Sequence, residues 1–174
     1  VVKRLIDQEH HATDDLLLVW SAQGGHVDMV QFFLDRGADV HALDHYALRR
    51  SAEHGHVDAT KLLLDHGADV HAENDTALQR SARNGHLDVV QLLLDRGADV
   101  HARNDGALRR AVEKERRHVV RFLIQKMDTV PETLQPVVDV LLAYVPPFYM
   151  NSTKIDNCEC HVCYDTVPTY RCIR

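Results

Sequence analysis

The chain has 174 residues, of which 45% are hydrophobic and 26% charged, and it carries a formal net charge of −6 at pH 7. This length suits a single domain, and the negative charge disfavours specific binding to nucleic acid or to an anionic membrane. The longest apolar run, Val137 to Val145, contains Asp139 and is too short to cross a bilayer. All four cysteines lie between Cys158 and Cys172, so the rest of the chain folds without a disulfide, as is usual in a reducing compartment. We therefore expect an intracellular, cytoplasmic protein that makes no membrane contact.

The first residues look like the end of a repeated unit. Residues 1–7, Val-Val-Lys-Arg-Leu-Ile-Asp, match residues 89–95, Val-Val-Gln-Leu-Leu-Leu-Asp, later in the chain. We predict a partial unit over 1–10 and expect further units to precede it.

A longer pattern then recurs at a fixed spacing. The pairs that begin with His41, His71 and His101, each followed by alanine, recur every 30 residues, and His11 begins one more copy. Self-similarity at this period is typical of a solenoid, in which each unit leaves an apolar face bare until a neighbouring unit covers it. The predicted units begin at about residues 11, 41, 71 and 101, and the repeat region covers 1–127.

Each unit predicts two helices. In the unit from 71, Asp75 is placed to cap a first helix that begins at Thr76 and ends at Gly85. A second, amphipathic helix is predicted over about 87–96, and Gly97 ends it. The residues that follow form a tight turn to the next unit.

The C-terminal part departs from this pattern. Glu115 and Met127 stand where earlier units have glycine, which marks the unit from 101 as the terminal one. After Pro131, apolar residues follow one helical face, so we predict a C-terminal capping helix over 128–145 that covers the open end of the stack. The remaining residues, 146–174, are predicted to form an irregular tail that contains the cysteines.

The units resemble ankyrin repeats. The stretch from Asn84 to Val100, Asn-Gly-His-Leu-Asp-Val-Val through Leu-Asp-Arg-Gly-Ala-Asp-Val, is close to the family consensus and recurs in three successive units. The usual threonine-proline pair is missing, and the segment between Val100 and Ala107 is about three residues shorter than the family norm. The resemblance covers roughly 1–127 and implies an all-α ankyrin-repeat solenoid of stacked helix-turn-helix units, with short turns in place of long hairpin fingers. The shortened unit is also similar to the ankyrin repeats of giant DNA viruses of amoebae.

The resemblance implies a binding surface. Ankyrin proteins dock their partners on the turns and on the outward side of the first helices, along the concave surface, and the units of this chain diverge in sequence there. The candidate partner-binding residues are Trp20, Tyr46, Arg49, Arg50, His54, Gln79, Arg80, Arg83, Arg109 and Arg110. Trp20, Tyr46 and Arg50 lead this set, because aromatic and arginine side chains are common interface anchors. In the alternative interpretation the arginines form a solvated face and Trp20 contacts a preceding unit. A third interpretation treats the arginines as a binding site for anionic ligands.

Motifs for catalysis or nucleotide binding do not occur in the repeats, and each acid, base or nucleophile there recurs at the repeat spacing. The resemblance implies that His26, His56 and His86 bond to the backbone of a neighbouring loop. The histidines that open the units form a ladder with rungs about 8–10 Å apart, too far for one zinc ion, whose nitrogen ligands lie at about 2.0–2.1 Å. We expect no enzymatic activity and no cofactor in the repeats.

The tail contains a cysteine motif. Cys158, Cys160, His161, Cys163 and Cys172 are a candidate zinc-binding set, because two cysteines separated by two residues can turn back on one ion. There are two alternatives: the cysteines are structural or reactive and bind no ligand, or two of them form a disulfide. Residues 160–165 also resemble the opening of a RING finger, the zinc domain of many ubiquitin ligases, although the later ligand pairs are absent, so that only a truncated RING would be present.

Together these features predict a non-catalytic scaffold for protein–protein interaction, a monomer that binds a partner protein through the concave ankyrin surface. The alternative is the substrate-recognition part of a ubiquitin ligase, in which the zinc tail recruits the transfer machinery. If the chain is viral, we expect it in the host cytoplasm. The fold does not identify the partner, because ankyrin units are interchangeable scaffolds.

Overall fold

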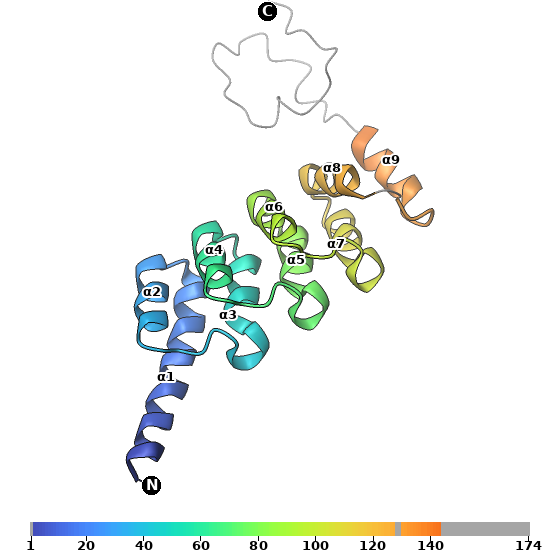
Figure 1. Ribbon diagram of the computed structural model, residues 1–174. Coiled ribbons are helices and arrows are strands. Elements are labelled where there is room, and N and C mark those ends of the chain that lie inside the picture. Colours follow the sequence, from blue (N-terminus) through green and yellow to red (C-terminus); the bar gives the residue numbers. More distant parts are fainter. Residues whose placement is uncertain (1, 128–129, 144–174) are drawn as a thin grey trace, which may run out of the picture.

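The computed structural model describes residues 2–127 and 130–143, with side chains from residue 13 onward. In this part of the chain all regular structure is helical (Figure 1). The helices are α1 (Val2–Gly24), α2 (Val27–Asp35), α3 (Ala42–Glu53), α4 (Val57–Asp65), α5 (Ala72–Asn84), α6 (Leu87–Asp95), α7 (Ala102–Glu113), α8 (Arg117–Lys126) and α9 (Gln135–Ala143).

The helices form two layers. The first helices of the units pack in the order α1, α3, α5, α7, the second helices in the order α2, α4, α6, α8, and each first helix also packs on its own second helix. Figure 1 shows the resulting stack of antiparallel pairs. The all-α solenoid of helix-turn-helix units is therefore confirmed.

Repeated leucines form the core of the stack. They are almost completely buried at equivalent positions 30 residues apart: Leu18, Leu48, Leu78 and Leu108 on the first helices, and Leu63, Leu93 and Leu123 on the second. Burying each leucine contributes about 1.5–3 kcal/mol. Alanines with no exposed surface, such as Ala52 and Ala82, let neighbouring helices approach closely. One unit cannot bury this face alone, so stability depends on stacking.

The turns between units are tight, as predicted, but their conformation is unusual. Residues 43–45, 73–75 and 103–105 all have φ between 51° and 57°, so three consecutive residues wind one left-handed turn before the right-handed helix begins. Such residues cost roughly 1–2 kcal/mol each outside glycine. Hydrogen bonds between units offset part of this cost, because the backbone N–H of Asp99 donates to the Asp75 carboxylate at 3.0 Å. Asp75 therefore links two units and does not cap its own helix.

The N-terminal segment forms a single helix where the sequence predicts a partial unit over 1–10 followed by a unit from 11. Helix α1 runs without a break from Val2 to Gly24. In the later units the link from the last aspartate of the second helix to the next histidine spans six residues and contains a glycine, as from Asp35 to His41. Between Asp7 and His11 the step is shorter and has no glycine, so nothing there favours the left-handed residue that ends a helix.

At the other end, α9 lies against α8 and α7, with Val138 and Leu141 buried. The capping helix predicted over 128–145 thus corresponds to α9 over Gln135–Ala143. At the turn before α8, Glu115 adopts φ 54° where the earlier units use glycine. The tail over 146–174 lies outside the described residues.

Candidate functional site

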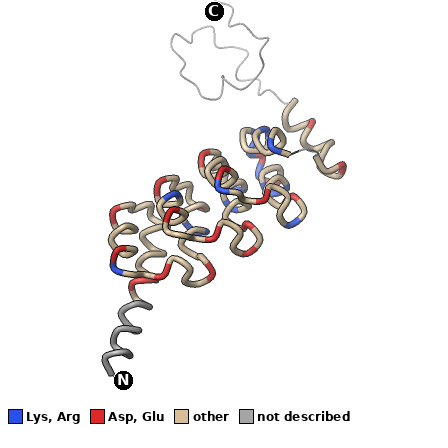
Figure 2. The backbone as a smooth tube through the Cα atoms, in the orientation of Figure 1, with Lys and Arg blue, Asp and Glu red and all other residues tan. Residues whose placement is uncertain are grey.

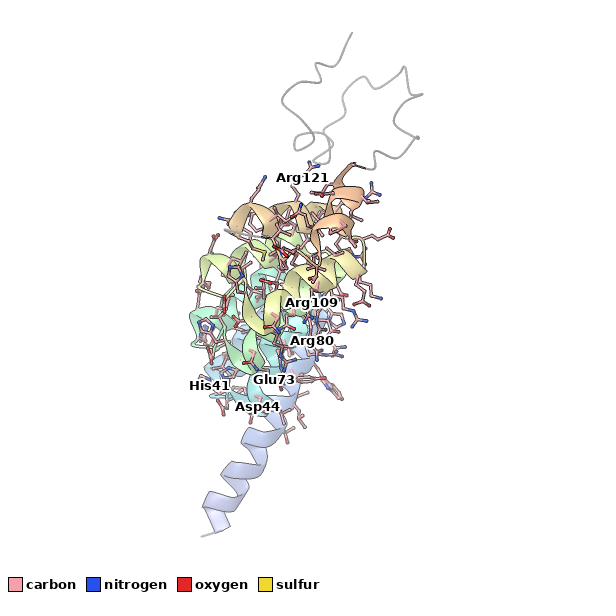
Figure 3. All side chains as sticks on the ribbon, turned by 90° about the vertical axis from the view of Figure 1, so that its right-hand side faces the viewer. His41, Asp44, Glu73, Arg80, Arg109 and Arg121 are labelled. Atoms are coloured by element: carbon pink, nitrogen blue, oxygen red, sulfur yellow. The ribbon has the colours of Figure 1, made fainter. Side chains whose placement is uncertain are left out.

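The candidate site lies on the exposed side of helices α1, α3, α5 and α7, which we call the first-helix face. Figure 3 shows Arg80 and Arg109 on the same side of the stack. Nearly all the residues predicted to bind a partner belong to these helices, but the structure gives them different environments.

Arg49 and Gln79 are in the interior, which corrects their assignment to a binding surface. Arg49 is 7% exposed and Gln79 1% exposed. The Arg49 Nη2 donates to the Leu43 carbonyl at 3.0 Å and its Nη1 pairs with Glu73, whereas the Gln79 Nε2 donates to the Asn74 carbonyl at 2.8 Å. Both side chains therefore hold the left-handed turn of their unit against its helix.

The two leading aromatic candidates differ in the same way. Tyr46 is half-buried, and the guanidinium groups of Arg49 and Arg50 lie 5.1 Å and 5.5 Å from its ring centroid. Such cation–π contacts fix the ring. Trp20, in contrast, is 69% exposed at the N-terminal edge of the face. Of the two, Trp20 offers far more free aromatic surface to a partner.

Next to Tyr46, a carboxylate bridges two units. Glu53 Oε2 accepts from Arg80 Nη1 at 2.7 Å and from Arg50 Nη1 at 3.0 Å, while Arg50 Nε donates to Gln23 Oε1 at 3.1 Å. Partial burial acts to raise the pKa of Glu53, but the hydrogen bonds and charges of Arg80 and Arg50 outweigh it, so the pKa lies below its ordinary value. Here the chain pairs both arginines with one of its own carboxylates.

One unit later the charges are not balanced. A hollow of about 540 Å³, which we call the arginine hollow, lies between α5 and α7. Its lining residues are Gln79, Arg83, Arg103, Gly106, Arg109, Arg110 and Glu113. Arg109 Nη2 donates to the Arg103 carbonyl at 3.0 Å. Within the described residues, none of the four arginines forms an ion pair with a carboxylate.

The predicted partner-binding set includes Arg83, Arg109 and Arg110 of this lining but not Arg103, which the sequence places on a turn, or Gly106. A comparison of equivalent positions reveals both. Arg103 stands where the preceding unit has Glu73, and Gly106 where it has Thr76. Figure 2 shows basic segments on α7 and α8. The hollow therefore arises from departures from the repeat.

His54, the remaining candidate, is exposed, but its Nδ1 donates to the Arg50 carbonyl at 2.9 Å, within its own helix. The ring also stacks on His56 at a centroid distance of 6.2 Å. His54 is thus accessible from outside and fixed in position.

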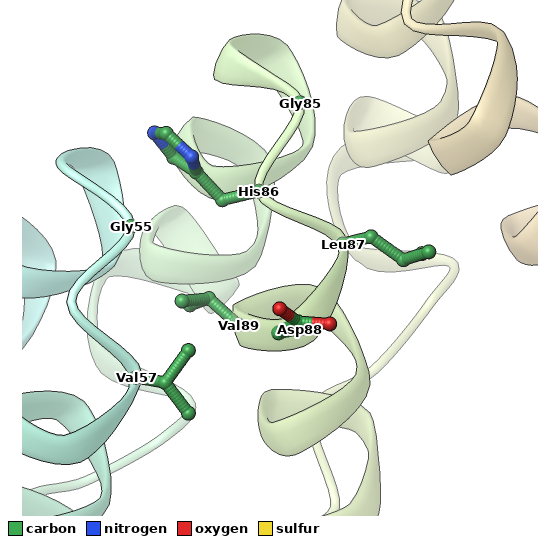
Figure 4. Close-up of a pocket in the computed structure, with 7 residues that line it drawn as sticks. All are labelled: Gly55, Val57, Gly85, His86, Leu87, Asp88 and Val89. Atoms are coloured by element: carbon green, nitrogen blue, oxygen red, sulfur yellow. The ribbon is translucent and has the colours of Figure 1, made fainter. Parts of the chain in front are cut away.

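A second, smaller hollow of about 260 Å³ lies on the loops between the two helix layers (Figure 4). Its histidine, His86, donates from Nε2 to the Glu53 carbonyl at 3.0 Å. Burial lowers the pKa of His86 and outweighs the opposing effect of this bond. His56 makes the equivalent bond to the Gln23 carbonyl at 2.9 Å, which confirms the predicted structural role for His56 and His86.

Over residues 13–127 and 130–143, no group of three or more histidine, cysteine, aspartate or glutamate side chains could hold a metal ion. Two of the ladder histidines pair with aspartates, His71 with Asp75 at 3.1 Å and His101 with Asp105 at 2.7 Å. The predicted zinc ligands Cys158, Cys160, His161, Cys163 and Cys172 lie outside the described residues. The zinc site and the ubiquitin-ligase alternative that depends on it stay predictions from the sequence.

The fold and this face define a helical-repeat protein with a surface that varies from unit to unit. The family model for ankyrin repeats, described as three copies, matches residues 1–74, 18–104 and 71–133, so the chain belongs to the ankyrin-repeat family. Ankyrin repeats generally mediate protein–protein interaction. A search of curated protein sequences found no match. In the described part of the chain, no helix combines the length and the apolar character needed to span a bilayer.

Proposed function

We propose that this chain is a non-catalytic scaffold that binds a partner protein through the first-helix face, the concave surface of the solenoid. The main support is the contrast between buried and exposed positions on the same helices. The buried leucines of α1, α3, α5 and α7 repeat without change, whereas the exposed positions vary. One such position has Trp20, Arg50, Arg80 and Arg110, and its neighbour has Gln23, Glu53, Arg83 and Glu113. The buried Arg49 and Gln79 also differ from their counterparts, but they bond to carbonyls of their own turns, whereas all the residues at these two positions are at least partly exposed to a partner.

Trp20 carries this proposal furthest among single residues. An indole that is 69% exposed gives a large, rigid contact area with little side-chain entropy to lose on binding. Because Arg49 and Gln79 are buried, they are excluded from the candidate set. The accessible candidates are Trp20, Tyr46, Arg50, His54, Arg80, Arg83, Arg109 and Arg110. Action as a monomer in the cytoplasm, and the similarity to giant-virus repeats, stay predictions from the sequence.

The test compares two double variants in affinity capture with the full chain, followed by identification of the captured proteins by mass spectrometry. Trp20→Ala with Arg80→Ala changes the first-helix face. The control, Lys61→Ala with Gln91→Ala, changes exposed positions on the second helices α4 and α6. A partner that is retained by the control and lost by the first variant supports the proposal. Equal capture by both variants contradicts it, provided that circular dichroism shows both to be folded.

A further inference from the structure

The arginine hollow is best understood by comparison with the unit before it. Arg80 reaches back 27 residues to Glu53, and the same step from Arg110 leads to Arg83. A carboxylate that accepts from two arginines is thus replaced by a third cation. Both Arg83 and Arg110 line the hollow. The site has the geometry of the Glu53 bridge without its anion.

Two further changes enlarge this imbalance. Glu73, which pairs with Arg49, is replaced one unit later by Arg103. Gly106 has no side chain where earlier units have Tyr46 and Thr76, which opens the floor of the hollow. The result is four guanidinium groups and one carboxylate lining a single hollow, in a chain whose net charge is −6.

The single carboxylate does not neutralise the arginines. Glu113 has a side chain that is 66% exposed, and its ion pair is with its neighbour Lys114 at 3.7 Å. Like charges held together raise the free energy of the unbound chain, and an incoming anion relieves this repulsion. The hollow is therefore selective for negative charge.

We propose that the arginine hollow binds an acidic segment of a partner protein, with one of its carboxylates taking the place that Glu53 occupies one unit earlier. This inference rests on the proposed function, because it assigns the chemistry of a partner to part of the first-helix face. Guanidinium groups bind carboxylates through paired, parallel hydrogen bonds, which gives orientation as well as affinity.

The extent of the basic surface favours a peptide over nucleic acid. Toward the N-terminus the arginines are paired with Glu53 and Glu73, so the unpaired basic surface ends there and is too short for a long polyanion that continues along the face. A volume of about 540 Å³ with arginines on two helices also suits several side chains better than one isolated phosphate. A short run of glutamates or aspartates meets both conditions.

The test measures binding of fluorescently labelled hexaglutamate to the full chain by fluorescence anisotropy, at low salt and at near-physiological salt. Arg110→Gln should weaken binding about tenfold, the loss expected for one charge-assisted hydrogen-bond pair. Arg83→Glu should abolish binding, because it places beside Arg110 the carboxylate that the hollow lacks. Lys61→Gln, which removes the same charge from the exposed surface of α4, should leave the affinity unchanged.

Three results would overturn the inference: no binding of hexaglutamate, equal loss in Arg110→Gln and Lys61→Gln, or at least tenfold preference for a phosphoserine peptide or a single-stranded oligonucleotide. The second would show general attraction of charge only. Partner capture separates this inference from the proposed function. If a partner requires Trp20 and Arg80 but binds the Arg83→Glu variant normally, the proposed function is supported and the acidic-segment inference is contradicted. If the chain binds hexaglutamate but the variant Trp20→Ala with Arg80→Ala loses no partner, the acidic-segment inference stands and the proposed function is contradicted.

Discussion

Replacement of Arg49 by alanine tests whether a charged residue in the repeat core acts as a structural element. The guanidinium donates to the Leu43 carbonyl at 3.0 Å, pairs with Glu73 and lies 5.1 Å from the Tyr46 ring centroid. Its Nε is buried without a hydrogen-bond partner among the described residues. Arg49→Ala removes all of these interactions and leaves the left-handed turn over 43–45 without its side-chain anchor.

The magnitude follows from the separate contacts. Leaving the Leu43 carbonyl without its donor costs about 1–3 kcal/mol, and the contact with Tyr46 contributes about 0.5–1 kcal/mol. The Glu73 side chain is 41% exposed, so its ion pair contributes no more than about 1 kcal/mol. Release of the buried Nε returns about 1 kcal/mol. These contributions add up to about 0.5–4 kcal/mol, so we expect Arg49→Ala to lower the free energy of unfolding by about 2 kcal/mol, with a decrease in Tm of roughly 6 °C.

The chain supplies a matched control. Gln79 stands at the equivalent position and donates to a turn carbonyl without any charge. Arg49→Gln should therefore keep the hydrogen bond to the turn and cost only about 1 kcal/mol. Urea unfolding followed by circular dichroism at 222 nm measures both variants. The reasoning fails if Arg49→Ala is within about 0.5 kcal/mol of the original chain, or if glutamine is as damaging as alanine.

Two further predictions concern the loops between units. The His45 Nδ1 accepts the Asp69 N–H at 3.0 Å, and burial, assisted by the charge of His41, lowers the pKa of His45 below 6.5. The unfolded chain then takes up a proton at a higher pH than the folded chain, so this contribution to stability is complete above pH 6.5 and declines as the pH falls toward the folded pKa. His45→Asp, which installs the aspartate found in the other units, should reduce the loss of stability between pH 7.5 and pH 5.5 in urea titrations; an unchanged loss would contradict the assignment. Gly55→Ala should lower Tm more than Gly67→Ala in thermal melts. Both glycines have positive φ, but a Cβ on Gly55 would lie 2.5 Å from the His86 ring, whereas a Cβ on Gly67 would meet nothing within 4 Å. Equal decreases in Tm would show that the ring moves away freely.

Most of the fold follows from the sequence because the period is fixed. Equivalent leucines at 30-residue intervals identify the core, and glycines at the helix ends identify the turns. The left-handed turns could not be predicted in the same way, because Leu43 and Arg103 have no intrinsic preference for positive φ. The conformation depends on bonds between units, such as that from Asp99 N–H to Asp75, which no single unit contains.

The N-terminal helix differs from the predicted division into units for another reason. Residues 1–7 match the end of a second helix in their apolar pattern, and that pattern alone supports a helix. Whether the helix ends there depends on the next few residues, which lack the glycine of the other units. The apolar match therefore indicates the helix but not where it ends, and the division into units at residue 11 stays a prediction.

For the candidate site, divergence between units indicates a face but not which of its residues are exposed. Arg49 and Gln79 are polar and variable, yet they adjoin the leucine column and bond to carbonyls of the turn. Burial of a long polar side chain depends on whether a backbone acceptor lies within its reach, which the one-dimensional pattern does not contain.

A repeat protein provides its own reference for each charged contact, because neighbouring units place equivalent residues in the same backbone geometry. Arg80 facing Glu53 shows how this geometry satisfies a cation from within the chain. Arg110 is placed by the same step near Arg83 and has no such anion. The change from Glu53 to Arg83 at this repeat position therefore separates an arginine that is paired within the chain from one that is not. Like charges that are held close together without a counter-charge repel one another, so an interface that selects acidic partners is expected at the step where the repeat no longer pairs its own arginines. That step is the one between α5 and α7, and a single reversal, Arg83→Glu, is sufficient to test it.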